Sequence, residues 1–599
     1  MLINSRHLRP VRNIFLASAA IVGLHACATA PTQTLTPDQL LTAPYALRGG
    51  APFDVDAMLA AMPDWLIVEH GGARFDEALG AMVISDLRFA LSFAPDAALV
   101  VERAVMWGGD PVAARDVFSG ASSLIEKRAI FDRMSMDNIR SEGLQWDTGA
   151  QSASLSIDKM VIDGLAARSY ALSSIPGSEE GVDLLRHFAA ATGAYAYDGA
   201  AYAGFSMRFS NNRGDNTELT IEEGFARGYD AGAVDYQSLR GLYARVGSGA
   251  GGPVVEISGQ QSEDAETSPY AKILNRPPAE AVNEALRSPA AFLAQMTGGF
   301  DTEYEIAFTE TRAMDLSGAF AWLARWELPP ITETDLIDLG AQTMLGYRQT
   351  WNGAPIYTLD RAEVAASDFY WLVPSNYSVA YQGFTYQFDT AFGQMLDQMG
   401  PGFATEAAPA FEQTMQTFSA LGLDRMAGDM DMDWRWDGVT GDAALSLGMD
   451  IIDLTGVDFQ LSAGGPSLAR WEQMARQDTP VTEAATEIAL KEFRYSLTDF
   501  GIIDRAFAFA AEQNGAGSGP ELRQSMVAMA RLSGAQMGEA DPRLPTYANA
   551  VADFLDAGGT ITLLAAPPSP VTLMQLQAAS QSAPQSLPEL LNITITHTE

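Results

Sequence analysis

A strict alternation of apolar and charged side chains is the feature that most limits how this chain can fold. In residues 430–437 the order is Met-Asp-Met-Asp-Trp-Arg-Trp-Asp, so every second side chain is apolar and every other one is charged. Successive side chains of a β-strand point to opposite faces, and an alternation of this kind is typical of a half-buried strand. The sequence therefore predicts a strand here, with two methionines and two tryptophans on one face.

The turn and the second strand that follow this segment recur elsewhere in the chain. Residues 436–447, 146–157 and 209–221 each show an aromatic-ended strand, a Gly/Asp/Asn turn and a second alternating strand, and residues 75–89 form a looser copy. Such turns need positive φ, which Gly, Asp and Asn tolerate best. We expect β-hairpins at these places, although chance similarity between hairpins remains an alternative. The predicted fold class is α+β and β-rich, with repeated antiparallel hairpins forming extended sheets and with intervening helices.

Helices are predicted mainly towards the end of the chain. Ser518 and Glu521 have the spacing of a capping box, with Pro520 in the first turn, ahead of residues 522–537. Residues 547–555 continue in a helical pattern up to two glycines. Strands are expected again at 560–564 and 591–595, and further helices at 182–195, 279–295 and 409–420.

These patterns suggest six segments along the chain. Residues 247–268 are rich in glycine and then acidic, which is typical of a linker. The predicted order is a signal peptide (1–26), a flexible tether (27–45), a β-rich domain with helices (46–246), the linker (247–268), a mixed β/α domain with an aromatic segment (269–400) and a β-rich domain with C-terminal helices and a final strand (401–599).

The first 27 residues have the parts of a secretory leader. Three arginines precede an apolar run of eleven residues at 14–24, and the only cysteine of the chain, Cys27, follows shortly after. A helix needs about 20 residues to cross the ~30 Å hydrocarbon core of a bilayer, so a retained membrane helix is the weaker interpretation. Two further interpretations of this segment are an ordinary signal peptide cleaved after Ala30, and a lone buried cysteine at position 27.

Leu24, Ala26 and Cys27 resemble the lipobox of bacterial lipoproteins, whereas His25 is bulkier than the usual residue at its position. The resemblance covers residues 1–27 only. It implies that the peptide is cut before Cys27, that the thiol is diacylated, and that the protein is held in the cell envelope. Ala28 after the cysteine favours the outer membrane by the same resemblance. With Cys27 acylated, no thiol remains for a disulfide.

The chain is strongly acidic, with 37 basic and 75 acidic residues and a net charge of −38. A field of this sign repels phosphate backbones, and no cluster of Lys or Arg provides a local exception, so nucleic acid is not expected as a partner. The acidity is explained either by solubility or by binding of cations or basic partners.

Two groups of residues are candidates for binding. Asp429, Asp431 and Asp433 begin like a calcium loop, but Trp434 stands where an EF-hand requires glycine. They either share a divalent cation along one strand face or form a solvated face. An aromatic segment either stacks on sugars or acyl chains or fills a core; its candidate ligand residues are Tyr377, Tyr381, Phe384, Tyr386 and Phe388.

No other motif predicts catalysis or a cofactor. The glycines at 247–252 match a dinucleotide pattern but do not open a helix. His70, His187 and His597 have no partner at metal-ligand spacing, although His70 is expected on a loop and His597 in the C-terminal tail. Asp499, in an Asp-Phe-Gly triplet, lacks the other kinase motifs. With so many acids, a carboxylate pair for hydrolysis cannot be chosen from the sequence.

The hairpin pattern loosely resembles the long β-repeat proteins of the Gram-negative envelope, among them the AsmA-like group. That resemblance implies extended sheets that hold or guide lipids. We therefore expect a lipid-anchored, non-enzymatic envelope protein, facing the periplasm or the exterior, whose sheet presents an apolar groove to lipid or to an envelope protein. The alternatives are a hydrolase of envelope glycan that uses a carboxylate pair, and a structural spacer.

The leader yields a direct prediction. Mass spectrometry of membrane fractions will find the mature N-terminus at Cys27 with its thiol acylated, because the apolar run is long enough for export but too short to remain as an anchor. A soluble, unmodified chain that begins at Pro31 would contradict this expectation.

Overall fold

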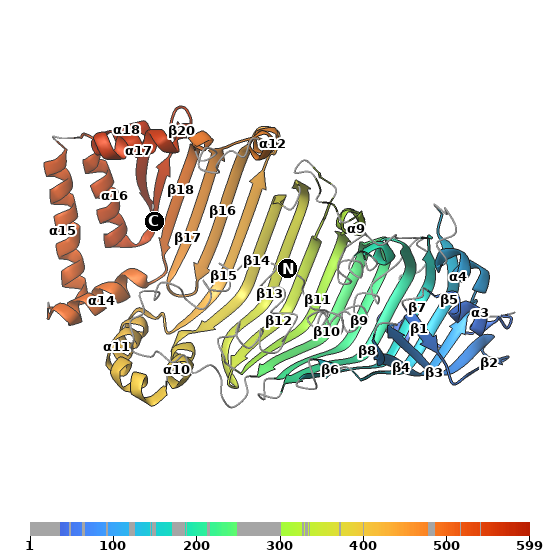
Figure 1. Cartoon of the computed structure of the whole chain (residues 1–599). Coiled ribbons are helices and arrows are strands. Elements are labelled where there is room, and N and C mark those ends of the chain that lie inside the picture. The colour runs from blue at the N-terminus through green and yellow to red at the C-terminus, as the bar shows by residue number, and fades with distance from the viewer. Residues whose placement is uncertain are drawn as a thin grey trace, which may run out of the picture. The chain divides into compact units, whose positions relative to one another are not determined.

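The structure is a computed structural model of the whole chain (Figure 1). It describes residues 36–46, 50–62, 66–91, 94–118, 126–143, 145–146, 151–169, 186, 189–211, 216–247, 301–325, 327, 329, 333–334, 336–370, 373–398, 400–476, 486–515, 517–538 and 541–599. The chain divides into two compact units, which are described separately. Unit 1 comprises residues 1–329 and 336–353, and unit 2 comprises residues 330–335 and 354–599.

Unit 1 is an antiparallel sheet in which most strands pair with the next strand in the sequence. β1 and β2 both pair with β3, and the short β6 pairs with one end of β7; the remaining order is β3-β4-β5-β7-β8-β9-β10-β11-β12. The strands are β1 Leu66–Glu69, β2 Gly72–Asp76, β3 Ala81–Leu91, β4 Ala94–Trp107, β5 Arg128–Glu142, β6 Gln145–Trp146, β7 Gln151–Ala167, β8 Tyr195–Asn211, β9 Asn216–Asp230, β10 Ala233–Gly247, β11 Thr302–Asp315 and β12 Gly340–Trp351; the helices are α2 Pro37–Thr42, α3 Val55–Leu59, α4 Pro111–Phe118 and α9 Ser317–Arg325.

The core of unit 1 lies on one face of this sheet. Val55 and Met58 of α3 and Val117 of α4 are buried there against the strands. On the opposite face, Leu40 and Leu41 of α2 pack against apolar side chains of β7, β8 and β9. Burial on both faces is consistent with the continuous apolar runs in these strands, such as residues 81–84 of β3 and 97–101 of β4.

A row of residues with left-handed backbone conformation crosses unit 1 at equivalent positions of neighbouring strands. Core-facing side chains on either side of the row are three residues apart instead of two, as in Ile157 and Met160 on β7 and in Tyr202 and Phe205 on β8. The two strands of a pair switch the face of their side chains at the same position, so the pairing register is the same on both sides of the row. Along this row, left-handed residues alternate with acidic residues or Ala307 on the neighbouring strands. The left-handed residues, with φ between 51° and 67°, are Asp86, Asn138, Gly204, Gly241 and Gly346. The residues paired between them are Glu102, Asp158, Glu222 and Ala307.

The acidic members of the row lie against the left-handed residues of the next strand. The Asp158 carboxylate occupies the space that a side chain at Gly204 would need. Asn138 donates a hydrogen bond to Glu102, with Nδ2 2.8 Å from Oε2. A second row with the same alternation lies six residues away along β7, β8 and β9, at Gly164, Asp198 and Gly228. At Gly204 and Gly241 glycine is required, because a side chain there would be strained and would collide with Asp158 or Glu222, whereas Asp86 and Asn138 adopt the same backbone conformation with their own side chains.

Unit 2 contains a second antiparallel meander, with helices inserted between its strands. Its strand order is β13-β14-β15-β16-β17-β18-β19-β21, and β20 pairs with one end of β18. The strands are β13 Ala354–Tyr370, β14 Val373–Gln387, β15 Arg425–Trp436, β16 Asp442–Ile451, β17 Thr455–Gly464, β18 Ala489–Asp499, β19 Gly559–Ala565, β20 Val571–Thr572 and β21 Ile593–Thr598; the helices are α10 Phe388–Gln398, α11 Gly400–Leu421, α12 Leu468–Arg476, α14 Ile502–Asn514, α15 Gly519–Met537, α16 Leu544–Ala557, α17 Leu573–Ser582 and α18 Leu587–Leu590, with the 3₁₀ helix η3 Pro584–Ser586.

The predicted fold class is confirmed, since both units are β-rich sheets built from antiparallel hairpins with intervening helices. Each of the four predicted hairpins is present, as β15–β16, β6–β7, β8–β9 and β2–β3. The predicted helices at 522–537, 547–555 and 409–420 lie within α15, α16 and α11. The capping box at the start of α15 also forms, with Ser518 N donating to Glu521 Oε2 at 2.9 Å.

Several expectations need correction or lie outside the described residues. The end of the expected tether is packed, because residues 37–42 form α2 and bury Leu40 and Leu41. Residues 189–192 are helical, but the helix expected at 182–195 ends before Tyr195, which begins β8. His597, expected in the C-terminal tail, lies in β21. The signal segment with Cys27, residues 248–268 of the linker, and the helix expected at 279–295 lie outside the described residues.

The row of left-handed residues predicts which glycines tolerate alanine. Gly204→Ala will lower the free energy of unfolding by about 2 kcal/mol or more, because it places a side chain at φ +67° and drives it into the Asp158 carboxylate. Gly353→Ala is the matched control, since Gly353 has φ +79° but no atom within 4 Å of a new Cβ. The urea midpoint of each variant, followed by circular dichroism, checks this. Equal losses at the two positions would contradict the role of the acidic partner.

Candidate functional site

The most extensive candidate site is one face of the unit 2 sheet, which we call the apolar face. Three cross-strand rows, each contributed by eight neighbouring strands from β13 to β21, define it, and twenty-three of these twenty-four side chains are apolar or aromatic. The rows are Ala366-Tyr377-Trp434-Leu445-Leu461-Phe493-Ala565-Ile593, Val364-Val379-Met432-Leu447-Phe459-Tyr495-Leu563-Ile595 and Ala362-Tyr381-Met430-Met449-Val457-Leu497-Ile561-His597.

The opposite face of the same strands is polar. Asp429, Asp431 and Asp433 of β15 are exposed there, as are Asp458 and Gln460 of β17. The threonines of β21 are also exposed on this face. The alternation along each strand and the register between strands thus place charge and hydroxyls on one side and hydrocarbon on the other.

The apolar face is not sealed as a core would be. Of its twenty-four side chains, only Ala362, Ala366, Val379 and Ala565 are buried. The others keep at least partial exposure, and Tyr495 is 37% exposed. Contiguous apolar surface of this extent on a folded chain marks a place where a ligand, a membrane or a partner binds.

Helices of unit 2 cover the margins of the apolar face. At one margin, α16 packs on β19 and β21, and Phe554 of α16 meets His597 of β21 with ring centroids 6.4 Å apart. At the other, α10 contacts β13 and β15, and the ring centroids of its Phe388 and of Tyr386 are 4.4 Å apart. Figure 1 shows α10 and α11 at one end of β14 and β15, and α14 to α16 beyond β18.

The five candidate aromatics lie on or next to this face, in different surroundings. Tyr377 and Tyr381 occupy two of its rows and are partly exposed. Phe384 is buried, at 9% exposure, opposite Gly428 of β15. Tyr386 and Phe388 belong to an aromatic cluster that continues to Phe418 of α11, and burial raises the pKa of Tyr386. The structure therefore separates packing aromatics from aromatics that remain accessible.

The three candidate metal ligands are on the polar face of β15, alternating as the sequence suggested. Asp429 Oδ1 accepts a hydrogen bond from Gly383 N at 2.7 Å. Gly383 lies in a β-bulge of β14, between Tyr381 and Phe384. Alternate carboxylates on one strand are about 7 Å apart. Among the residues that the structure describes, no group of three or more His, Cys, Asp or Glu is arranged to hold a metal ion.

The remaining motif residues have local structural partners. His70 Nε2 is 2.8 Å from Asp56 Oδ1, and His597 Nε2 is 2.7 Å from the Gly558 carbonyl. Asp499 accepts hydrogen bonds from the Gly501 and Ile503 amides at 3.0 Å and 3.1 Å, at the start of α14. His187 lies outside the described residues.

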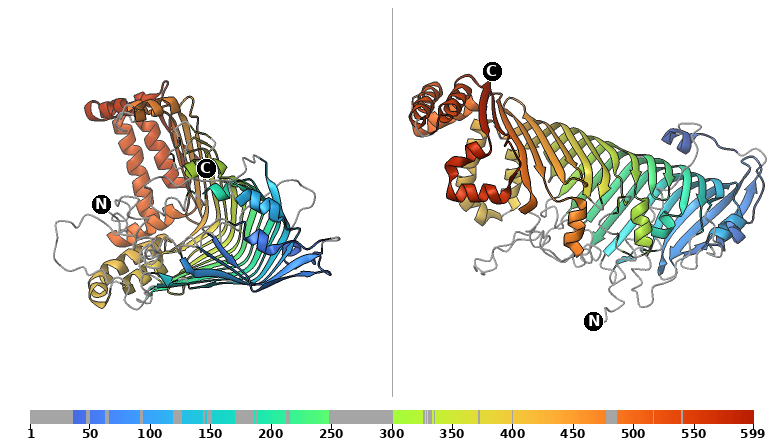
Figure 2. Two further views of the ribbon diagram at one scale, coloured as in Figure 1. Left: turned by 45° about the vertical axis from the view of Figure 1, so that its right-hand side comes forward. Right: turned by 90° about the horizontal axis from the view of Figure 1, so that it is seen from above.

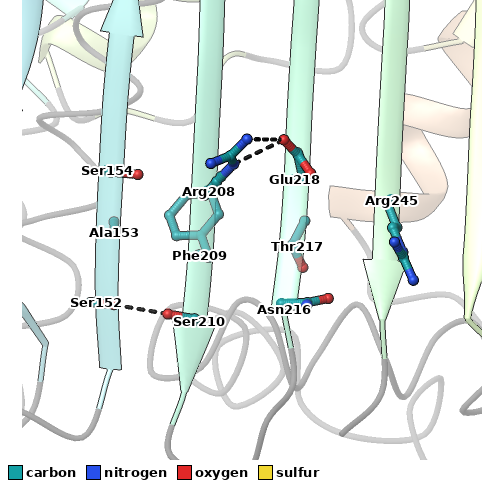
Figure 3. Close-up of a pocket in the computed structure, with 10 residues that line it drawn as sticks. All are labelled: Ser152, Ala153, Ser154, Arg208, Phe209, Ser210, Asn216, Thr217, Glu218 and Arg245. Atoms are coloured by element: carbon teal, nitrogen blue, oxygen red, sulfur yellow. Dashed lines mark hydrogen bonds and ion pairs between the residues drawn. The ribbon is translucent and has the colours of Figure 1, made fainter.

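A second, polar pocket of about 510 Å³ lies in unit 1 at the ends of β7 to β10 (Figure 3). Arg208 binds Glu218 with its Nε and Nη2 at 2.9 Å and 2.7 Å from Oε1, and Arg245 is paired with Asp301 at 2.5 Å, which raises the pKa of Arg245. Because both arginines already have carboxylate partners, the described lining presents no free cation to an anionic ligand. That lining is Ser152, Ala153, Ser154, Arg208, Phe209, Ser210, Asn216, Thr217, Glu218 and Arg245.

Sequence reasoning identified the strand at 430–437 and the aromatic segment but missed the apolar face as a whole. The alternating signal was present in several strands, for example in residues 445–449 and 457–461. What the sequence lacked was the register that brings these positions together.

Within the described residues, no helix is both long enough and apolar enough to cross a bilayer.

Comparison with known protein families gives one partial match. A family model described as "Uncharacterized protein" matches residues 446–598, which run from β16 to β21 and include α12 and α14 to α18. A search of curated proteins finds no match.

The two classes of aromatic will respond differently to truncation. Phe384→Ala will lower the free energy of unfolding by about 3–5 kcal/mol, because it empties a buried site. Tyr381→Ala will lower it by only about 1–2 kcal/mol, because part of the ring is already in contact with solvent. Urea unfolding of the two variants measures the difference. A loss at Tyr381 as large as that at Phe384 would mean that the apolar face is a closed core.

Proposed function

We propose that the apolar face of unit 2 holds the acyl chains of a lipid, in a protein attached to the cell envelope through Cys27. The observation that carries this proposal is the contrast between the two sides of one sheet. On one side all but one of the side chains in the three rows are apolar or aromatic and most are partly exposed, while carboxylates and hydroxyls occupy the other. A sheet of a monomeric chain with a solvated back normally buries its apolar front.

The dimensions of the face suit hydrocarbon chains. Eight strands at ~4.8 Å spacing extend over about 34 Å, and three rows two residues apart extend over about 14 Å. One leaflet of a bilayer is about 15 Å of hydrocarbon, half of the ~30 Å core. The extent across the strands therefore exceeds the length of an acyl chain, so a lipid can lie with its chains across the strands and with its headgroup at the margin of the face.

The side chains on the face favour hydrocarbon over sugar. Seven of the nine side chains that its central strands β15 to β17 contribute are methionine, leucine or valine, for example Met432, Leu447 and Val457; the other two are Trp434 and Phe459. No carboxylate, amide or hydroxyl stands among these nine to bind sugar hydroxyls. Recognition of a sugar needs hydrogen-bonding groups beside the aromatic platform. The exposed carboxylates of β15 point away from the face, so they offer no facing pair for glycan hydrolysis.

The envelope location is supported by the leader alone. The apolar run at 14–24 and Cys27 resemble a lipoprotein signal, and a single acyl-modified cysteine would place the chain beside a membrane. A protein that carries lipid in the envelope needs such a position, because its cargo comes from a bilayer.

Lipid content tests the proposal directly. The full chain with Cys27→Ser, which prevents acylation, is purified without detergent and extracted with organic solvent. Mass spectrometry is expected to find acyl lipids in a fixed ratio to protein. A lipid-free preparation that also fails to bind a fluorescent phospholipid analogue would reject the proposal.

A pair of adjacent substitutions locates the binding surface. Leu447→Gln will weaken binding of the analogue about tenfold or more, because it buries an amide against hydrocarbon without a partner. Ser446→Gln is the control, since it introduces the same side chain on the opposite face of the same strand. Circular dichroism and the urea midpoint confirm that both variants fold. Equal effects on binding would show that lipid does not occupy the apolar face.

A further inference from the structure

The outer side of helix α15 is an apolar surface without a partner in the described part of the chain. Val527 and Gly534 face inward, and Gly534 lies against Ala548 of α16. Figures 1 and 2 show α15 as the outermost helix of unit 2, separated from the strands by α16. On its other side Met526, Met529, Leu532 and Met537 are 40%, 51%, 61% and 47% exposed. We call these four residues, together with the partly exposed Leu522, the methionine face.

The methionine face carries no charge, although the chain as a whole is highly charged. At 100° per residue, its members fall within an arc of about 140° around the helix axis. The other residues of α15 within this arc are only glycine, serine and glutamine. The charged side chains of α15 all turn to internal partners. Arg523 pairs with Asp504 at 2.5 Å, and Arg531 pairs with Asp553 at 2.9 Å. Glu521 accepts a hydrogen bond from the Ser518 amide.

The area of this face decides against a stable dimer. A helix of nineteen residues is about 28 Å long, and a stripe ~10 Å wide along it offers about 300 Å². A stable protein interface buries about 800 Å² on each partner. A membrane surface has no such minimum, because an amphipathic helix lies in the headgroup region with its apolar face turned to the acyl chains.

Charge decides which membrane surface is suitable. With a net charge of −38 the chain is repelled by anionic headgroups, and both arginines of α15 are already paired with carboxylates. We propose that the methionine face of α15 lies in the interface of a bilayer rich in zwitterionic lipid. The contact requires neither the acylated cysteine nor a filled apolar face, so it extends the proposed function without depending on it.

A single-thiol reporter tests this contact in the full chain. Cys27 is the only cysteine, so Cys27→Ser with Met529→Cys leaves one thiol for an environment-sensitive NBD label. On addition of phosphatidylcholine vesicles the emission is expected to shift to the blue and to rise several-fold, with little change when the salt concentration is raised. Val439→Cys in the same background is the control, because Val439 is 80% exposed on a hairpin turn far from α15 in the sequence, and its label should not respond.

Substitution of the face completes the test. In the Cys27→Ser chain, Met529→Gln with Leu532→Gln should reduce co-sedimentation with these vesicles about tenfold or more, because two exposed apolar side chains are lost. Leu573→Gln with Met574→Gln, at another exposed apolar pair, should not. The inference is overturned if the label at residue 529 ignores vesicles, if it responds only to anionic ones, or if it responds to protein concentration alone, which would indicate self-association. Loss of vesicle binding with retained lipid content would separate this contact from the apolar face.

Discussion

Antiparallel pairing in a nearly constant register is the constraint on which the apolar face of unit 2 depends. Side chains alternate between faces, so a slip of one residue between two strands would carry Asp431 or Asp433 into a row of methionine and leucine. The register shifts at two places in the pairs that build the face. At the first, Gly383 takes φ +64° and absorbs the extra residue, so Phe384 returns to the same side as Tyr381. A glycine therefore preserves the segregation of the two faces.

In unit 1 the side chains also change faces along the strands, but there the change occurs at the same level in successive strands. Left-handed residues such as Gly204 and Gly241 alternate with Asp158 and Glu222 across the sheet, and each pair of strands changes parity together. The acidic side chain fills the space that the glycine leaves. Part of the strong negative charge thus has a structural explanation, in addition to solubility.

The two proposals place different chemistry on neighbouring parts of unit 2. The apolar face presents hydrocarbon from eight strands, with α16 covering one margin. The methionine face of α15 is the outer surface of the same helical layer. Leu447 and Met529, which carry the respective tests, both fall within the segment that matches a protein family. Together, the two proposals assign the contact with a membrane to the methionine face and the contact with acyl chains to the apolar face.

The sequence by itself determined the local structure. Period-two alternation identified the strand at 430–437, glycine and aspartate marked the hairpin turns, and the capping box located the start of α15. These signals act between residues close together in the chain, so they can be read without the fold. Only the tertiary structure decided the register, since that depends on contacts between strands far apart in the sequence, such as Phe493 of β18 with Ala565 of β19. It also decided that Phe384 is packed while Tyr381 stays accessible, because the exposure of a side chain is set by what the rest of the chain leaves uncovered.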